Sequence, residues 1–154
     1  MINYPSSLPL PRLKDAAYKR QPNILRTEMS TGRARQRRKH LSVPTHMEAT
    51  WRLRKDEATV FEGFVDHGVN LIDWFLMDIL TPRGVVKHQV RFMKDPLENM
   101  KPISTLVWQY QAQIEMKEYK AASEEEAVVK ALAPNTFEEF VNGVESALST
   151  YQES

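Results

Sequence analysis

The chain has 154 residues, of which 27% are charged and 42% are hydrophobic, and its formal net charge is +1. This is the length of one ordinary domain, which can bury enough surface to fold without a disulfide or a structural metal. The sequence contains no cysteine, which excludes disulfide scaffolds, thiolate zinc sites, iron–sulfur clusters and cysteine nucleophiles.

The small net charge hides a segregation of charge along the chain. Residues 1–55 carry 13 Lys and Arg against 3 Asp and Glu, whereas residues 56–154 carry 8 against 17. The two parts therefore have formal charges of +10 and −9. Such a division between halves is typical of proteins that assemble with other proteins or contact nucleic acid.

The sequence has neither the pattern of a secretory signal nor that of a membrane span. Its first residues lack a basic segment followed by a long apolar run. The longest apolar stretch lies within residues 71–80 and contains Asp73 and Asp78, which disfavours a transmembrane helix. We therefore expect a protein that is made and kept in a cytosol-like compartment, or built into a particle there.

Residues 1–45 are a poor globular sequence, and we expect them to form an extended, Pro-rich, basic arm. Apolar residues are sparse, and proline, which fixes φ and removes an amide donor, occurs at positions 5, 9, 11, 22 and 44. The run Arg33–Lys39 has five basic residues in seven, and like charges this close repel one another in a compact isolated form. This run is therefore either mobile or held by an acidic partner.

Residues 46–119 have the pattern of a β-rich core that contains one helix. Apolar and polar residues alternate over residues 47–54, as in a half-buried strand. The acidic pair Asp56 and Glu57 suits the first turn of a helix, an apolar stripe follows at helical spacing, and glycine ends it. The pattern predicts a helix over residues 56–67.

Three further strands are predicted in the rest of this core. Residues 70–80 are dense in aromatic and β-branched side chains, which indicates a buried strand, and Thr81–Gly84 closes it with a turn. Residues 85–93 and 106–116 alternate, so that one face lies in the core and the other in water. Residues 94–102 contain two prolines and are predicted to be a loop.

Residues 120–154 are predicted to be a helical C-terminal extension. Residues 124–133 are acidic and helix-prone, and Thr136 can cap a last helix with Glu139 in capping-box position. This last helix, over residues 136–150, carries one apolar stripe that must be covered by the domain's own sheet or by a neighbouring subunit. The stripe consists of Phe137, Phe140, Val141, Val144 and Leu148.

We find no constellation of residues that would carry catalysis or hold a metal or a cofactor. The histidines at positions 40, 46, 67 and 88 do not share a helix or strand face, and five scattered glycines cannot build a phosphate loop. Asp73 and Asp78 would lie on opposite faces of a strand and are a weak acid pair. Because no nucleophile, base and orienting group occur together, we expect no enzyme, no cofactor and no small-molecule substrate.

The basic run is the strongest polar signal, and three interpretations of it stay open. It can dock on an acidic protein face, neutralise the phosphates of nucleic acid, or form a solvated loop. No aromatic residue is interleaved with it, which argues against recognition of single strands by base stacking. The candidate contact residues are Arg33, Arg35, Arg37, Arg38 and Lys39 of this run and Phe137, Phe140 and Val144 of the last helix.

The aromatic residues of the predicted strands and helix have the spacing of a core and not of a ligand site. They come from every predicted element of residues 46–119. The set is Trp51, Phe61, Phe64, Trp74, Phe75, Phe92, Trp108 and Tyr110.

Four segments of this core follow one another in an order that can be compared with known protein families. They are the helical segment Arg54–Gly68, the aromatic segment Asp73–Leu76, the Val-Arg-Phe segment Val90–Phe92 and the Trp segment Val107–Tyr110. Over about residues 25–118 the pattern resembles the minor tail protein M and distal tail protein family of lambda-like bacteriophages. One departure is the turn Ser30–Arg33, where family members often carry Gly-Asp-Gly-Tyr and only the glycine is retained here.

The resemblance implies a mainly β fold with flanking helices, an antiparallel β-sandwich or open barrel of the phage tail-tube type. It implies a structural virion protein that forms a hexameric ring at the distal end of the tail tube, joins the tube to the tail tip or baseplate hub, and lines the DNA channel. Its partners would be copies of itself, the tail tube protein and hub proteins, with non-specific contact to DNA, in a virion assembled in the bacterial cytoplasm. Two alternatives stay open: a head–tail connector or tail-completion protein, and a nucleic-acid-binding module that uses residues 33–39.

Overall fold

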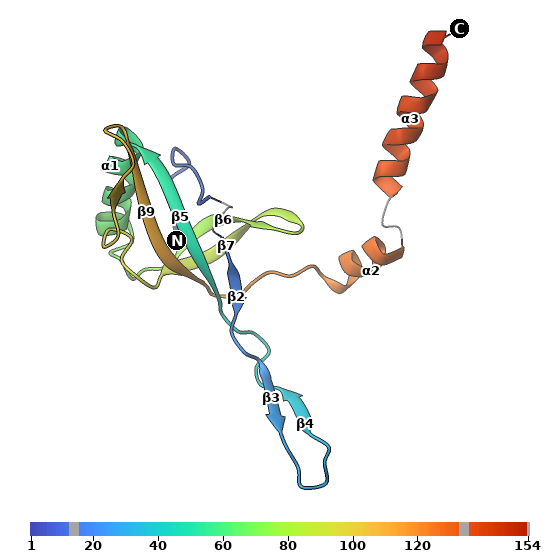
Figure 1. The fold of residues 1–154 in the computed structure, drawn as a ribbon, viewed down its shortest axis with the longest axis horizontal. Coiled ribbons are helices and arrows are strands. Elements are labelled where there is room, and N and C mark those ends of the chain that lie inside the picture. The colour runs from blue at the N-terminus through green and yellow to red at the C-terminus, as the bar shows by residue number, and fades with distance from the viewer. Residues whose placement is uncertain (13–15, 133–135, 154) are drawn as a thin grey trace. The chain divides into compact units, whose positions relative to one another are not determined.

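The structure is a computed structural model that describes residues 1–12, 16–132 and 136–153, with the side chains of these residues except those of 136–140 and 150–153. The chain divides into two compact units, residues 1–120 and residues 121–154 (Figure 1). The expected division at residues 45 and 119 into arm, core and extension stays a prediction. Each unit is described here by itself.

Unit 1 is built on one seven-stranded sheet with the strand order β1-β6-β7-β9-β5-β2, and β8 pairs with β9 outside this order. All pairs are antiparallel except β1 with β6. The strands are β1 (Ile2–Asn3), β2 (Tyr18–Arg20), β5 (Thr45–Arg54), β6 (Phe75–Thr81), β7 (Gly84–Phe92), β8 (Lys101–Pro102) and β9 (Val107–Met116). The expected fold class, mainly β with flanking helices, is confirmed, although the sheet expected to be antiparallel contains the parallel pair of β1 and β6.

The pair β5 and β9 is the longest ladder of the sheet. Ten residues of β5 face ten residues of β9, from Thr45 opposite Met116 to Arg54 opposite Val107. Both strands alternate as the sequence predicts, because successive side chains of a strand point to opposite faces. The buried face includes Trp51 and its cross-strand partner Tyr110. Leu106, which the sequence pattern placed in the strand, lies before β9 and is exposed.

The sheet curls so that its two ends approach each other. The hydroxyl of Tyr18, on the edge strand β2, donates to the backbone oxygen of Leu80 on β6 at 2.9 Å. At the other end the short strand β1 pairs with β6 in parallel, with Ile2 opposite Phe75. Residues 1–45 thus supply two strands that flank the core, and Leu8 lies buried within it.

One helical segment covers the inner face of the sheet. It consists of the α-helix α1 (Lys55–Gly63) and a π-helical turn η1 (Phe64–Gly68), so the helix predicted over residues 56–67 is confirmed. The helix begins there because the backbone N–H of Arg54 donates to the carboxylate of Glu57 at 3.0 Å, which satisfies a free amide of the first turn. Phe61 and Val65 on its inner side are fully buried.

The core beneath this helix is a continuous set of aromatic contacts. Phe61 lies 5.1 Å from Trp51 and 5.0 Å from Tyr110 between ring centroids, and Phe64 meets Phe75 edge-on at 5.3 Å. Such ring pairs add about 0.5–1.5 kcal/mol each beyond the burial of their area. The helix is therefore held to the sheet by packing of rings from β5, β6 and β9.

The strand predicted over residues 70–80 is wrong in its first half. Strand β6 begins only at Phe75, because Asn70 and Leu71 have φ of 48° and 65°, a left-handed conformation that ends the π-helical turn and cannot continue a strand. The backbone N–H of Asp73 donates to the oxygen of Val69 at 2.8 Å. Aromatic and β-branched density predicted the strand correctly but not the tight turn before it.

The two strands β6 and β7 form a hairpin whose turn is the predicted Thr81–Gly84. The Thr81 hydroxyl donates to the backbone oxygen of Gly84 at 2.8 Å, and Gly84 has φ of 104°, which side chains of L-residues rarely adopt. The alternation of β7 predicts that Val86, His88, Val90 and Phe92 face inward; the last three are buried and Val86 is half-buried. Segment 94–102 is a loop as expected, except that its end pairs with β9 as β8.

Unit 2 consists of two helices, α2 (Glu124–Leu132) and α3 (Thr136–Glu153). Both were predicted from the sequence. Ser123 caps α2 reciprocally, since its hydroxyl accepts from the N–H of Glu126 at 3.2 Å and its own N–H donates to the Glu126 carboxylate at 3.1 Å. Helix α2 has no buried residue.

We expect Phe61→Ala to lower the free energy of unfolding by about 3–5 kcal/mol, because it removes the ring that joins α1 to the sheet and leaves a cavity. Urea denaturation followed by tryptophan fluorescence measures this change. The neighbouring variant Val60→Ala is the control, since Val60 is 45% exposed and its truncation changes stability by less than about 1 kcal/mol. Equal losses for both variants would contradict this account of the core.

Two glycine substitutions should have opposite signs. Gly84→Ala forces a Cβ into the left-handed region and should cost about 1–3 kcal/mol. Gly63→Ala lies in helical backbone with open space around the new Cβ, so it should stabilise the fold by about 0.5–1 kcal/mol. Thermal melts of the two proteins, compared with the parent, give the two shifts directly.

Candidate interaction surface

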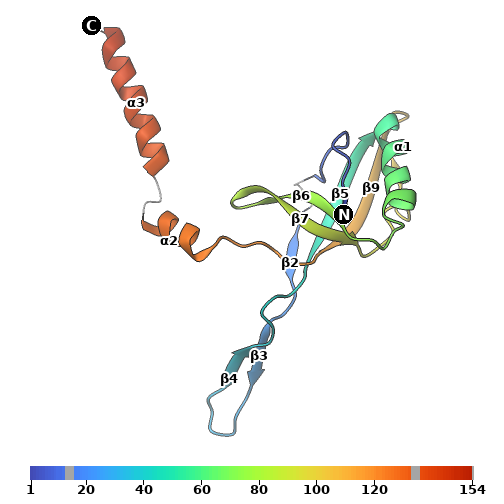
Figure 2. The same ribbon diagram turned by 180° about the vertical axis from the view of Figure 1, so that it is seen from behind.

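A two-stranded hairpin leaves the sheet between β2 and β5 (Figures 1 and 2). Its strands are β3 (Ile24–Thr27) and β4 (Arg35–Arg38), paired with Ile24 opposite Arg38 and Thr27 opposite Arg35. Gly32 has φ of 84°, and its N–H donates to the oxygen of Met29 at 3.1 Å, which closes the tip. The basic run predicted from the sequence thus forms one strand of this hairpin.

Asn23 holds the base of the hairpin together. Its side-chain amide donates to the backbone oxygen of His40 at 2.7 Å, and its side-chain oxygen accepts from the His40 N–H at 2.7 Å. The N–H of Lys39 donates to the backbone oxygen of Asn23 at 2.9 Å, and the N–H of Gln21 to that of Pro44 at 3.1 Å. The hairpin is thereby a continuation of the β2–β5 pair and not a free loop.

The hairpin carries a dense positive charge. Residues 20–39 contain seven Lys and Arg and one acid, Glu28. Within the described part of the chain none of these seven cations makes an ion pair. Arg26 instead hydrogen-bonds Gln36, and Arg38 donates to the backbone oxygen of Leu41 at 2.9 Å. These cations are therefore not neutralised within the described part of the chain, and their positive potential can attract an acidic partner.

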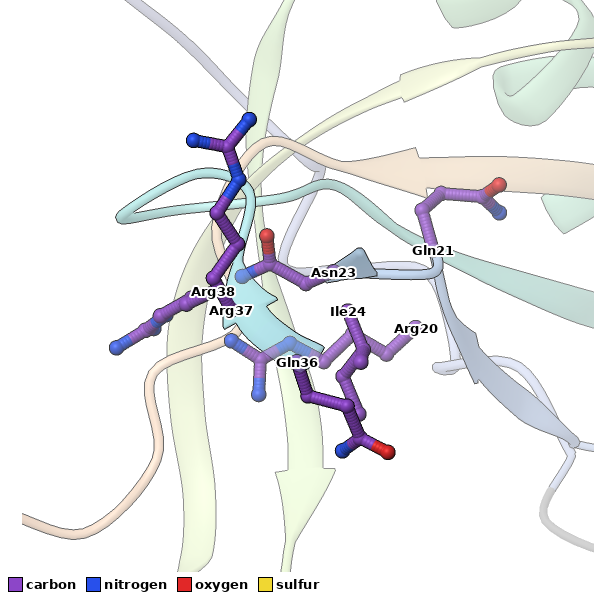
Figure 3. Close-up of a pocket in the computed structure, with 7 residues that line it drawn as sticks. All are labelled: Arg20, Gln21, Asn23, Ile24, Gln36, Arg37 and Arg38. Carbon is purple, nitrogen blue, oxygen red and sulfur yellow. The ribbon is translucent and has the colours of Figure 1, made fainter. Parts of the chain in front are cut away.

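The two faces of the hairpin differ. One face has a shallow hollow lined by Arg20, Gln21, Asn23, Ile24, Gln36, Arg37 and Arg38; Figure 3 shows its arginine side chains reaching away from the backbone beside the amides of Asn23 and Gln36. The strand register places Leu25, Thr27, Arg35 and Arg37 on the face opposite Ile24, Gln36 and Arg38. A second hollow there is lined by Leu25, Thr27, Met29, Arg35 and Arg37, and Arg37 borders both hollows. The second face combines two guanidinium groups with two apolar side chains.

This arrangement suits contact with an acidic surface. All residues of β3 and β4 are exposed except Leu25, which is half-buried, and an isolated two-stranded hairpin is marginally stable in water. Residues 20–50 contain no Phe, Tyr or Trp, so the hairpin offers no ring on which bases could stack. What it offers is charge on two faces and a small apolar patch.

A second surface consists of the uncovered apolar side chains of unit 2. On α2 these are Val128, Val129 and Leu132, which are 48%, 64% and 81% exposed. On α3, Val144 and Leu148 are also exposed. The side chains of the other predicted contact residues, Phe137 and Phe140, lie outside the described residues.

The structure places the predicted core residues in two groups. Six of them are buried in one cluster: Trp51, Phe61, Phe64, Phe75, Phe92 and Tyr110. Trp108 is half-buried against this cluster. Trp74 is half-buried too, and the guanidinium of Arg91 lies 4.6 Å from its ring centroid.

Among the described residues no group of three or more His, Cys, Asp and Glu could hold a metal ion. Asp73 and Asp78 are both exposed. Burial, and then the neighbouring carboxylate of Glu62, to which its hydroxyl donates at 2.8 Å, raise the pKa of Tyr110 well above its ordinary value, so that this hydroxyl stays protonated.

His88 has a structural task that its place in the sequence did not reveal. It is fully buried, its Nδ1 lies 2.8 Å from the backbone oxygen of Val86, and its Nε2 accepts from the N–H of Lys120 at 3.2 Å. Tyr119 stacks on its ring at 5.8 Å. His88 therefore fixes the last residues of unit 1, at the point where the chain leaves the sheet.

A row of polar side chains across the outer face of the sheet was also not predicted from the sequence. Arg91 on β7 donates to Glu115 on β9 at 2.5 Å, His46 on β5 lies 4.0 Å from the same carboxylate, and Gln21 reaches His46 at 2.8 Å. These residues are far apart in the sequence and meet only through the pairing of β5, β9 and β7. Only the register of the strands could have revealed them.

No protein-family model matches this sequence, and no curated protein matches it. The fold is similar to that of a solved chain described as the virion of a native gene transfer agent (GTA) particle, with a TM-score of 0.51 and 11% sequence identity. The similarity covers 78% of this chain and 98% of that chain. At this identity the likeness is one of fold.

None of the helices in the described residues combines the length and the hydropathy that a membrane span requires.

Asn23→Ala should loosen the hairpin while the sheet stays intact. The substitution removes both side-chain hydrogen bonds to His40, each worth about 1 kcal/mol, so the amides of β3 and β4 should exchange with solvent roughly tenfold faster or more. Hydrogen exchange followed by NMR measures this. Asn99→Ala, in an exposed loop, is the matched control, and unchanged exchange in Asn23→Ala would show that Asn23 does not hold the base.

Proposed function

We propose that this chain is a structural protein of a phage-like virion. The observation that carries the proposal is the similarity of fold to a chain of the gene transfer agent virion, which extends over 98% of that chain. The exposed basic hairpin supports it, because a protein that acts by assembly needs a surface directed at a partner. The proposal gives the chain an assembly role and no catalysis.

In its finer form the proposal is a ring at the distal end of the tail tube, as the resemblance to distal tail proteins implies. A ring in which subunits meet head to tail needs two different and complementary surfaces on each subunit. The hairpin β3–β4 is strongly basic, while residues 121–154 contain seven acids and one lysine. Opposite charges of this kind guide encounter and fix the orientation of neighbours.

A contact of the same hairpin with DNA is the second candidate, favoured by the seven cations of residues 20–39. Several phosphate contacts would make binding to duplex DNA visible at about 50 mM salt and weaken it steeply as salt rises. An electrophoretic shift assay over a salt series tests this. A salt-dependent shift supports a DNA contact, and its absence at low salt excludes the DNA-binding module.

A head–tail connector is the third candidate, and gold labelling of the C-terminus in particles distinguishes it by position.

We expect Arg35→Glu with Arg37→Glu and Arg38→Glu to abolish ring assembly without unfolding the monomer, because all three side chains are exposed and their charge is reversed. Light scattering coupled to size exclusion measures the mass of the assembly, and circular dichroism measures the fold. The matched control reverses three exposed lysines elsewhere in unit 1: Lys94, Lys101 and Lys117. Normal assembly of the arginine variant would remove the hairpin from the interface.

A further inference from the structure

Helix α2 and the second face of the hairpin have matching chemistry. On α2, Val128, Val129 and Leu132 share one side at helical spacing, and Glu124 and Glu125 extend the same side by one turn. The second hairpin face presents Arg35 and Arg37 together with Leu25 and Met29. Each surface thus combines two like charges with a few apolar side chains, and the charges are of opposite sign.

The two surfaces also match in length. A helix of nine residues spans about 13 Å at roughly 1.5 Å per residue. The four-residue ladder of β3 and β4 spans about 13 Å at roughly 3.3 Å per residue. One α2 helix therefore covers one hairpin face from end to end.

We propose that helix α2 of one copy docks on the Leu25, Thr27, Met29, Arg35 and Arg37 face of the hairpin of a second copy. This inference rests on the proposed ring, because a head-to-tail interface uses one surface of each kind on every subunit. Glu124 and Glu125 meet Arg35 and Arg37, while the three apolar residues of α2 cover Leu25 and Met29.

The size of this contact has a consequence for assembly. A nine-residue helix on a four-residue hairpin buries less than the roughly 1,200–2,000 Å² of a stable interface. A single contact is therefore weak, and closure of a ring makes the contacts stable together, since each later contact forms within one assembly. The chain should be monomeric when dilute and associate as its concentration rises.

The absence of cysteine from the sequence permits a direct test in the full-length protein. Thr27→Cys places a thiol on the hairpin face and Val129→Cys places one on α2, in two separate proteins. When the two are mixed and treated with a short bismaleimide linker, we expect a covalent heterodimer in severalfold excess over the control mixture. That control pairs Thr27→Cys with Val60→Cys, which lies on helix α1 and is 45% exposed. Isotope labelling of one partner identifies heterodimers by mass.

Charge exchange tests the pairing of residues within this contact. Adding Arg35→Glu and Arg37→Glu to the Thr27→Cys protein should abolish the excess heterodimer. Adding Glu124→Lys and Glu125→Lys to the Val129→Cys protein should restore it, because the signs are then opposite again. A loss that the helix variant does not restore would overturn the pairing of these charges.

Three outcomes decide the proposal. A heterodimer yield equal to that of the Val60→Cys control overturns it, even if light scattering finds a ring, and the proposed function then stands with another interface. If the protein with both Thr27→Cys and Val129→Cys closes on itself at a yield independent of concentration while the mixture gives no excess, α2 docks on its own hairpin and the inference is wrong. Excess heterodimer supports the docking even where the assemblies prove not to be rings, which would reject the ring alone.

Discussion

The ten-residue ladder between β5 and β9 is the constraint on which the rest of unit 1 depends. It buries Trp51 opposite Tyr110, and the aromatic contacts that hold α1 begin at these two rings. At its other end, Thr45 lies opposite Met116. Thr45 directly follows the segment that returns from the basic hairpin, and Met116 directly precedes the segment that leads to unit 2. One ladder therefore sets where both candidate contact surfaces leave the sheet.

The sequence predicted those parts of the fold in which periodicity and packing agree. The alternation of β5, β7 and β9 and the acidic first turn of α1 follow from local patterns that the tertiary structure reinforces. The cap of α2 at Ser123 was not predicted, and the cap predicted at Thr136 and Glu139 lies outside the described side chains. The strand over residues 70–80 failed in its first half because the turn uses Asn70 and Leu71 at positive φ. Asparagine is enriched in this conformation, but leucine gives no signal of it.

The candidate surface was found from the sequence as a charge pattern and not as a structure. Five basic residues in seven singled out residues 33–39, but the hairpin itself was not predicted, because its first strand, Ile24–Thr27, is too short and too exposed to stand out by alternation. Asn23 and His88 could not be assigned their tasks, since each bonds a backbone group 17 or 32 residues away. Contacts of this kind depend on strand register, which one sequence does not determine.

The anchoring of the chain at His88 also bears on mechanics. Any load on the C-terminal helices reaches unit 1 through Lys120, which His88 and the oxygen of Lys87 hold beside β7, and then through β9. That strand is hydrogen-bonded on one side to β5 and on the other to β7. Pulling it out requires many hydrogen bonds to break together, whereas a strand at an edge can be peeled away bond by bond. Tension applied at the C-terminal helices would therefore act first on a central strand that is paired on both sides.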